Sequence, residues 1–226
     1  MTHALLREVA AGRRGDALRV FRPGATVAFG RLDALRPGFA AACAAARRLG
    51  ATPVVRPAGG HAALYDPRSV VVEHITAEAD VTSGLQDRFR AQSALLRDVL
   101  AGLGADARIG ELRGEYCPGA YSVNVGGRLK VAGIAQRAAR GAALTTAVLT
   151  VGGGPWLRAA IVAVYGALAL DTDPATAGAL DEALPGVLPD AVAGAVRAAY
   201  GVTDVHELDG TLLDAARALV PRHRAP

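Results

Sequence analysis

The chain has 226 residues, of which 51% are apolar and only 4% aromatic, and its formal net charge is +4. This length suits one large domain with a core of alanine, valine and leucine. The arginines are scattered and few aromatic residues lie between them, which argues against a nucleic-acid interface. No apolar run reaches the roughly 18 residues of a membrane span, and residues 1–11 lack the layout of an export signal. We therefore expect a cytoplasmic protein without membrane contact.

The first half of the chain begins with short strands and an alanine-rich helix. Residues 17–30 predict two strands around a turn at Pro23-Gly24. Residues 38–49 predict a helix that ends before Gly50 and buries Cys43 as a small apolar side chain. Two further strands are expected, over residues 52–56 and, as a central strand rich in β-branched residues, over 69–75.

The second half predicts one long helix, a loop, three strands and then helices. Leucines and other apolar residues recur at helical spacing over 83–103, where Ser83 is placed to cap the helix. The later segments are a polar loop over 110–119, strands over 121–125, 129–135 and 142–151 with a Gly126-Gly127 hairpin turn, and helices over about 155–226. Strands followed by helices predict a single α+β domain, residues 1–226, with a mixed sheet flanked by helices.

A glycine pair follows the strand at 52–56, within the segment VVRPAGGHAALYD. Gly59 and Gly60 let the backbone approach a ligand closely, and Arg56 just before them could neutralise an anion. A Gly-Gly turn is more often purely structural, and His61 beside it could equally be an ordinary polar residue. Taken alone, this segment is a weak indication of a binding site.

Cys117 lies in the polar loop between a tyrosine and Pro118, outside any apolar periodic run. The following proline favours an extended conformation for Cys117, which would present the sulfur. An incidental, half-buried thiol is an equally good interpretation of the loop by itself. The two cysteines of the chain suit a reducing compartment without disulfides.

Lys130 interrupts the otherwise apolar strand 129–135. In a regular strand it shares a face with Arg128 and Ala132, opposite Leu129 and Val131. A lysine there is usually solvated. Over a glycine-lined pocket it could instead bind a carbonyl or phosphate, or favour the ionised form of a nearby thiol.

Taken in order, these segments resemble the biotin/lipoate A/B protein ligase superfamily. The resemblance rests on the Arg-Pro-x-Gly-Gly-x-Ala turn at 56–62 and on the Gly-Arg-x-Lys-x-x-Gly-x-x-Gln-Arg strand at 127–137. Within that superfamily the chain is most similar to the cysteine-dependent octanoyl/lipoyl transferase (amidotransferase) branch, because of Tyr116-Cys117-Pro118-Gly119. Lipoate ligases usually have a third glycine and a histidine before the aspartate, where this chain has His61 and Tyr65.

The resemblance implies a catalytic domain like those of class II aminoacyl-tRNA synthetases and biotin synthetase. It implies that Cys117 accepts an octanoyl or lipoyl group as a thioester, that Lys130 favours its thiolate, and that no cofactor is needed. The residues expected to bind substrate are Arg56, Gly59, Gly60, His61, Gly133, Ile134 and Ala135. The implied donor is acyl carrier protein or glycine-cleavage H protein, and the acceptor is a lysine of a lipoyl domain of a 2-oxoacid dehydrogenase or of H protein.

Two alternatives stay open on the sequence. The first is an ATP- and Mg-dependent lipoate-protein ligase that forms lipoyl-adenylate, in which Lys130 would bind the carboxyl group or the α-phosphate. The second is a non-catalytic protein that binds the acyl group without turnover. No structural metal site is expected, because the five histidines are dispersed and no Cys-x-x-Cys pair occurs.

Overall fold

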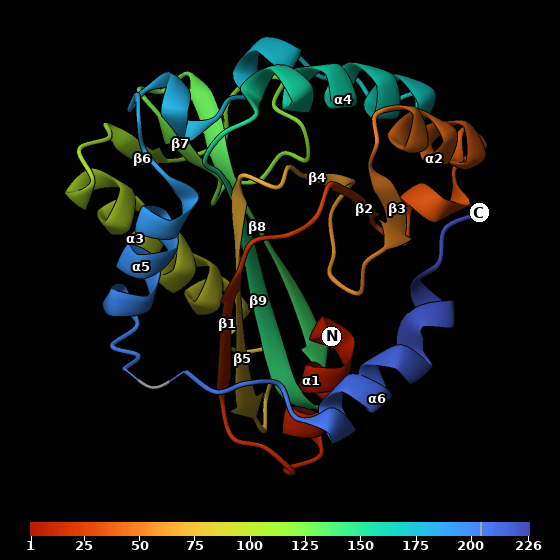
Figure 1. Ribbon diagram of the computed structural model, residues 1–226, viewed down its shortest axis with the longest axis vertical. Helices are drawn as coiled ribbons and strands as arrows, with labels where there is room; N and C mark the ends of the chain where they lie inside the picture. Colours follow the sequence, from red (N-terminus) through yellow and green to blue (C-terminus); the bar gives the residue numbers. More distant parts are fainter. Residues whose placement is uncertain (204) are drawn as a thin grey trace.

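The computed structural model describes residues 1–203 and 205–226, and a six-stranded sheet forms its centre (Figure 1). Every pair of neighbouring strands in this sheet is antiparallel. In sheet order the strands are β1 (Ala17–Phe21), β5 (Ser69–Glu78), β9 (Gly141–Thr150), β8 (Leu129–Ala139), β7 (Val123–Val125) and β6 (Ala107–Ile109).

A second, three-stranded sheet lies beside the first and carries the glycine turn. Its middle strand β2 (Thr26–Phe29) runs parallel to β3 (Thr52–Val55) and antiparallel to β4 (Ala63–Tyr65). Gly59 and Gly60 lie in the connection between β3 and β4. The predicted turn at Pro23-Gly24 therefore leads from the large sheet to the small one, since β1 and β2 belong to different sheets.

The helices cover three apolar surfaces (Figure 1). Helices α3 (Leu85–Gly102) and α5 (Pro189–Ala199) pack on the face of the large sheet that carries Val72 and Leu149. Helices α1 (Thr2–Ala10) and α6 (Gly210–Leu219) pack on the opposite face, against Ile75 and Leu144. Helices α2 (Phe39–Arg48) and α4 (Gly154–Ala167) cover the small sheet. The described residues also form short 3-10 turns at Asp33–Leu35, Pro174–Thr176, Leu180–Glu182 and Val220–His223.

The alternation of side chains along β5 and β9 explains why both faces need a cover. Along β5, Val70 and Val72 face one side, while Val71 and Ile75 face the other, and all four are at most 1% exposed. A strand that is apolar on both faces is stable only between two layers. Across the part of the chain that the structure describes, none of the helices combines the length and apolar character required to cross a bilayer.

Most predicted elements are confirmed, and the fold is α+β with a sheet flanked by helices. The helix at 39–48 is followed by Gly50 in a left-handed conformation, and Gly126 and Gly127 both have positive φ in the hairpin turn. The strand over 69–78 is interior but second from the edge. The predicted Ser83 cap is wrong: the cap position is Gly84, and the Ser83 hydroxyl donates to Asp80 O instead.

Candidate active site

A cleft of about 520 Å³ opens where β8 passes the glycine turn and the loop before β7. This volume is within the usual range for small-molecule sites. Of the nine residues predicted to form the site, the structure brings eight together along the cleft and leaves His61 out. The eight are Arg56, Gly59, Gly60, Cys117, Lys130, Gly133, Ile134 and Ala135.

Lys130 reaches the cleft because β8 contains a bulge. Asn124 pairs with Lys130 but the next residue, Val123, pairs with Ala132, so β8 has one extra residue at this point. The bulge reverses the alternation of faces and brings Lys130 to the side of Gly133, where a Cβ atom added to Gly133 would lie 3.5 Å from Lys130 Cε. The expectation that Lys130 and Ala132 share a face is therefore wrong.

Lys130 is 1% exposed and its ammonium group is fully engaged. Its Nζ donates to Glu115 Oε1 at 2.8 Å, to Tyr116 O at 2.9 Å and to Cys117 O at 2.8 Å. Glu115 is buried as well, and its carboxylate also accepts from Ser122 Oγ at 2.6 Å. A buried ion pair is tolerated when further hydrogen bonds satisfy both groups, as they do here. Sequence reasoning missed Glu115, one of two acidic residues in the loop before the cysteine.

Cys117 has φ +43°, and the prediction of an extended conformation is wrong. Positive φ is unfavourable for a residue with a Cβ atom, and such strain persists only where neighbours impose it. Here the Lys130 ammonium imposes it by binding the carbonyl oxygens of Tyr116 and Cys117. The thiol is half-buried and lines the cleft.

The glycine turn lies directly against the sulfur of Cys117. Gly60 has φ +83°, and a Cβ atom added to it would lie 2.9 Å from Cys117 Sγ and 3.1 Å from Arg56 Nη2. The turn is itself fixed on both sides: Gly59 N–H donates to Gln136 O of β8 at 3.2 Å, and a Cβ on Gly30 would lie 1.9 Å from Gly60 O. Only glycine permits these approaches.

His61 was expected to bind substrate, but its side chain contacts Asp33. Its Nδ1 lies 2.7 Å from Asp33 Oδ1, and Asp33 is completely buried. The second carboxylate oxygen of Asp33 accepts the Gly30 N–H at 2.9 Å. His61 and Asp33 therefore connect the glycine turn to the end of β2, whereas a direct contact of His61 with substrate stays a prediction.

The outer rim of the cleft contains aromatic residues that the sequence did not identify as site residues. Phe89 of α3 stacks on Tyr121 with ring centroids 5.3 Å apart and an interplanar angle of 8°. Both line the cleft, together with Leu85. In the sequence Phe89 is only one of several apolar residues of an amphipathic helix. Its position at the rim follows from where α3 begins.

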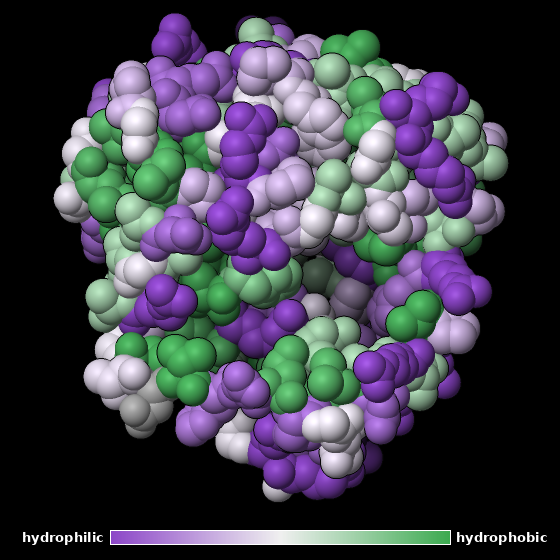
Figure 2. All heavy atoms as spheres, viewed as in Figure 1, coloured by the Kyte–Doolittle hydropathy of each residue, from purple (hydrophilic) through white to green (hydrophobic). Residues whose placement is uncertain are grey.

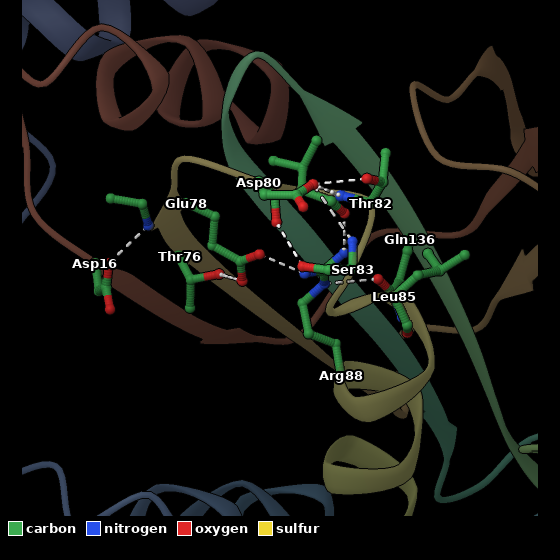
Figure 3. A network of polar contacts seen from close by, with 11 residues as sticks. Asp16, Thr76, Glu78, Asp80, Thr82, Ser83, Leu85, Arg88 and Gln136 are labelled. Atoms are coloured by element: carbon green, nitrogen blue, oxygen red, sulfur yellow. Dashed lines mark hydrogen bonds and ion pairs between the residues drawn. The ribbon is translucent and has the colours of Figure 1, made fainter.

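A polar network attaches the first turn of α3, which begins at Leu85, to β8 (Figure 3). Arg88 Nε donates to Gln136 Oε1 at 2.9 Å, and Gln136 Nε2 donates to Leu85 O at 2.8 Å. Arg88 also forms an ion pair with Glu78 at the end of β5. These bonds hold the apolar rim of the cleft at a fixed place over β8.

The groups around the sulfur are mostly uncharged. Burial raises the pKa of Tyr116 and of Tyr165, and Cys117 raises both further, so both phenols stay neutral at physiological pH. Burial also raises the pKa of Tyr65, an effect that the nearby Arg56 opposes. Within residues 1–203 and 205–226, no group of three or more His, Cys, Asp or Glu side chains could hold a metal ion.

A second cavity of about 800 Å³ lies between the small sheet and α6, and Figure 2 shows its opening as a hollow in the surface. Its walls include His3, His223 and Leu219, and it shares Arg56 and Thr146 with the cleft. His3 Nδ1 lies 2.9 Å from His223 Nε2, which joins the segment at α1 to the segment after α6. Sequence reasoning did not identify this cavity, because its walls come from both ends of the chain.

The fold and the cleft correspond to a known class of catalytic domain. Residues 1–169 match the Lipoyl protein ligase A/B catalytic domain family, and the chain belongs to that family. The resemblance found in the sequence is thereby confirmed.

Curated relatives have transferase names. The chain is 34% identical over 159 residues to the octanoyl-[GcvH]:protein N-octanoyltransferase of Geobacillus kaustophilus, covering 70% of this chain and 56% of the relative. It is 26% identical over 133 residues to the lipoyl-[GcvH]:protein N-lipoyltransferase of Listeria monocytogenes, covering 59% and 48%. The chain thus spans about half the length of the curated relatives it matches.

Solved structures confirm the fold. A crystal structure of lipoate-protein ligase A bound with ATP aligns with a TM-score of 0.71 at 21% identity, covering 98% of this chain and 87% of that one. A bipartite lipoate protein ligase from Thermoplasma acidophilum aligns with a TM-score of 0.69 at 19% identity, covering 98% and 87%. The predicted class II synthetase-like fold is therefore confirmed.

Proposed function

We propose that this protein transfers an octanoyl or lipoyl group through a thioester on Cys117. The observation that carries the proposal is the position of the Cys117 sulfur, which lies in van der Waals reach of the glycine turn at the wall of a cleft with an apolar side. A nucleophile with this placement can attack a carbonyl whose acyl chain occupies the cleft. The transferase names of the relatives support the same chemistry.

In the first half-reaction the Cys117 thiolate attacks the acyl carbonyl carbon. A C–S bond forms, the bond to the donor breaks, and the leaving group, an amine of H protein or a thiol of acyl carrier protein, takes up the proton that the thiol released. In the second half-reaction a lysine amine of the acceptor attacks the thioester, an amide bond forms, the C–S bond breaks, and the proton that the amine loses returns to the sulfur. Atoms balance without a nucleotide, a metal ion or a redox step.

The apolar side of the cleft suits the acyl chain. Leu85, Phe89 and Ile134 line it, whereas the strand residues Val71 and Val131 are buried in the sheet and do not. The Gly59 N–H donates to Gln136 O, so a backbone N–H of the turn that faces the developing oxyanion would come from Gly60.

In the names of the relatives, the octanoyl or lipoyl group is attached to GcvH, the H protein. We therefore propose acylated H protein as the donor, with acyl carrier protein as a second possible source. The proposed acceptor is the lysine of a lipoyl domain of a 2-oxoacid dehydrogenase.

Intact-mass spectrometry after incubation with octanoylated H protein tests the covalent step. We expect an octanoyl adduct on the wild-type protein that peptide mapping places on Cys117, and no adduct on Cys117→Ser. Transfer at the wild-type rate by Cys117→Ser would refute the proposal. Transfer that requires ATP and free acid, with release of an acyl-adenylate, would instead support the ligase alternative.

A further inference from the structure

The Lys130 ammonium has no hydrogen left for the sulfur of Cys117. An ammonium group carries three hydrogens, and these are directed at Glu115 Oε1, Tyr116 O and Cys117 O. The Glu115 carboxylate also neutralises the lysine charge at 2.8 Å. What Lys130 holds directly is the backbone of the loop, including the carbonyl oxygen of Cys117.

Arg56 provides a different cation beside the sulfur. A Cβ atom added to Gly60 would lie 2.9 Å from Cys117 Sγ and 3.1 Å from Arg56 Nη2. The sulfur and the guanidinium nitrogen are therefore at most about 6 Å apart. An opposite charge within about 4–6 Å favours the ionised form of a titratable group. The absence of a side chain on Gly60 leaves the space between the two groups open.

The guanidinium of Arg56 is also short of partners. Arg56 is 8% exposed, its Nη2 donates to His61 O at 2.8 Å, and its Nε makes no hydrogen bond. Among the residues that the structure describes, no carboxylate lies within ion-pair distance of it. A buried cation without a counter-ion is unfavourable, and an anion at Cys117 would relieve that cost.

Other charged and titratable groups near the sulfur compensate one another or stay neutral. Lys130 is paired with Glu115, and His61 is paired with Asp33. Tyr116 from the loop, Tyr165 from α4 and Tyr65 from β4 all have pKa values raised by burial. Arg56 is therefore the uncompensated charge facing the thiol in this part of the molecule.

We propose that Arg56 is the positioning residue that stabilises the Cys117 thiolate, and that Lys130 acts by clamping the loop. The inference deepens the proposed function and rests on Cys117 being its nucleophile. Arg56 does not form a bond to the acyl group in this scheme. It raises the thiolate fraction of Cys117 before attack.

The test measures the rate of Cys117 alkylation by iodoacetamide against pH, followed by peptide mapping so that Cys43 does not contribute. In Arg56→Gln we expect the midpoint of the rate profile to rise by about one pH unit or more, a roughly tenfold loss of thiolate below the midpoint. Arg56→Lys keeps a positive charge and is expected to keep most of the wild-type midpoint. An unchanged midpoint in Arg56→Gln would overturn the proposal.

The matched control is the double variant Lys130→Gln/Glu115→Gln, which removes the Lys130–Glu115 ion pair and leaves the net charge unchanged. We expect a lower melting temperature and a changed alkylation rate plateau, with the midpoint within a few tenths of a unit of wild type. If this variant raises the midpoint by a unit or more while Arg56→Gln leaves it unchanged, Lys130 supplies the stabilising charge and the proposal fails. A shifted midpoint in Arg56→Gln without any acyl adduct on wild type would refute the proposed function and leave the role of Arg56 standing.

Discussion

The two cysteines of this chain have opposite surroundings. Cys43 lies on α2 with none of its surface exposed, among small apolar residues, and burial raises the pKa of its thiol. Cys117 lies on a loop with φ +43°, against a glycine turn, at the wall of a cleft. The comparison teaches that the backbone around a thiol, more than the residue type, decides whether the sulfur is available for chemistry.

The largest expected difference between Cys117 and Cys43 is in the rates at which their thiols are alkylated. In native protein near neutral pH, iodoacetamide should modify Cys117 at least about 100-fold faster than Cys43, because Cys43 reacts only when α2 opens. Peptide mapping at timed intervals gives both rates. In urea the two rates should converge, and similar rates in the folded protein would contradict the comparison.

The second expected effect concerns the ion pair that supports the Cys117 loop. Glu115→Gln leaves the buried Lys130 ammonium without its counter-ion and should lower the free energy of unfolding by about 3 kcal/mol. Urea denaturation measures the loss. Asp98→Asn is the control, since Asp98 forms an exposed ion pair with Arg97, and its removal should cost less than about 1 kcal/mol. Equal losses in the two variants would show that the Lys130–Glu115 pair does not support the loop.

Gly60→Ala should separate backbone strain from crowding of the sulfur. Gly60 and Gly50 both have positive φ, at +83° and +73°, so alanine at either position should cost about 1 kcal/mol. A Cβ at Gly50 meets nothing within 4 Å, whereas at Gly60 it would touch Cys117 Sγ and Arg56. We expect Gly60→Ala alone to slow Cys117 alkylation, by roughly tenfold (about 1.4 kcal/mol). Equal alkylation rates in both variants would exclude this contact.

The smallest expected effect is a pH dependence of stability from Cys43. Its pKa is raised in the folded protein, so its contribution is complete below the unfolded pKa of about 8.5 and is lost as pH rises through the folded pKa. The difference in unfolding free energy between wild type and Cys43→Ala should therefore shrink as the pH rises above about 8.5. Urea titrations under reducing conditions measure this difference. A difference that is constant with pH would contradict the buried-thiol interpretation.

Periodicity and turn residues predicted most of the fold. The helix over 39–48, the hairpin glycines 126 and 127 and the strands on either side of them were all expected from local patterns. The partition of the strands into two sheets was not, because it depends on pairing between distant segments such as β1 with β5. Local patterns carry no information about which of several apolar strands lie side by side.

The site residues were found by motif, but their geometry was not. The sequence pointed to Cys117, Lys130 and the glycine pair, yet it assumed a regular strand at Lys130 and an extended Cys117. A one-residue bulge and a hydrogen bond to the Cys117 carbonyl overturned both assumptions. Glu115 and Phe89 were missed because an acidic loop residue and an apolar helix residue are unremarkable without their partners.

The extra residue in β8 has a consequence for how this strand can vary among relatives. In a regular strand, residues three apart face opposite sides, yet here Lys130 and Gly133 meet on one side. The Lys-x-x-Gly spacing therefore belongs to a bulged strand. Deleting Val131 would give a regular strand in which Lys130 and Gly133, then two positions apart, still share a face, so the lysine can tolerate a Lys-x-Gly spacing only if the bulge is lost at the same time.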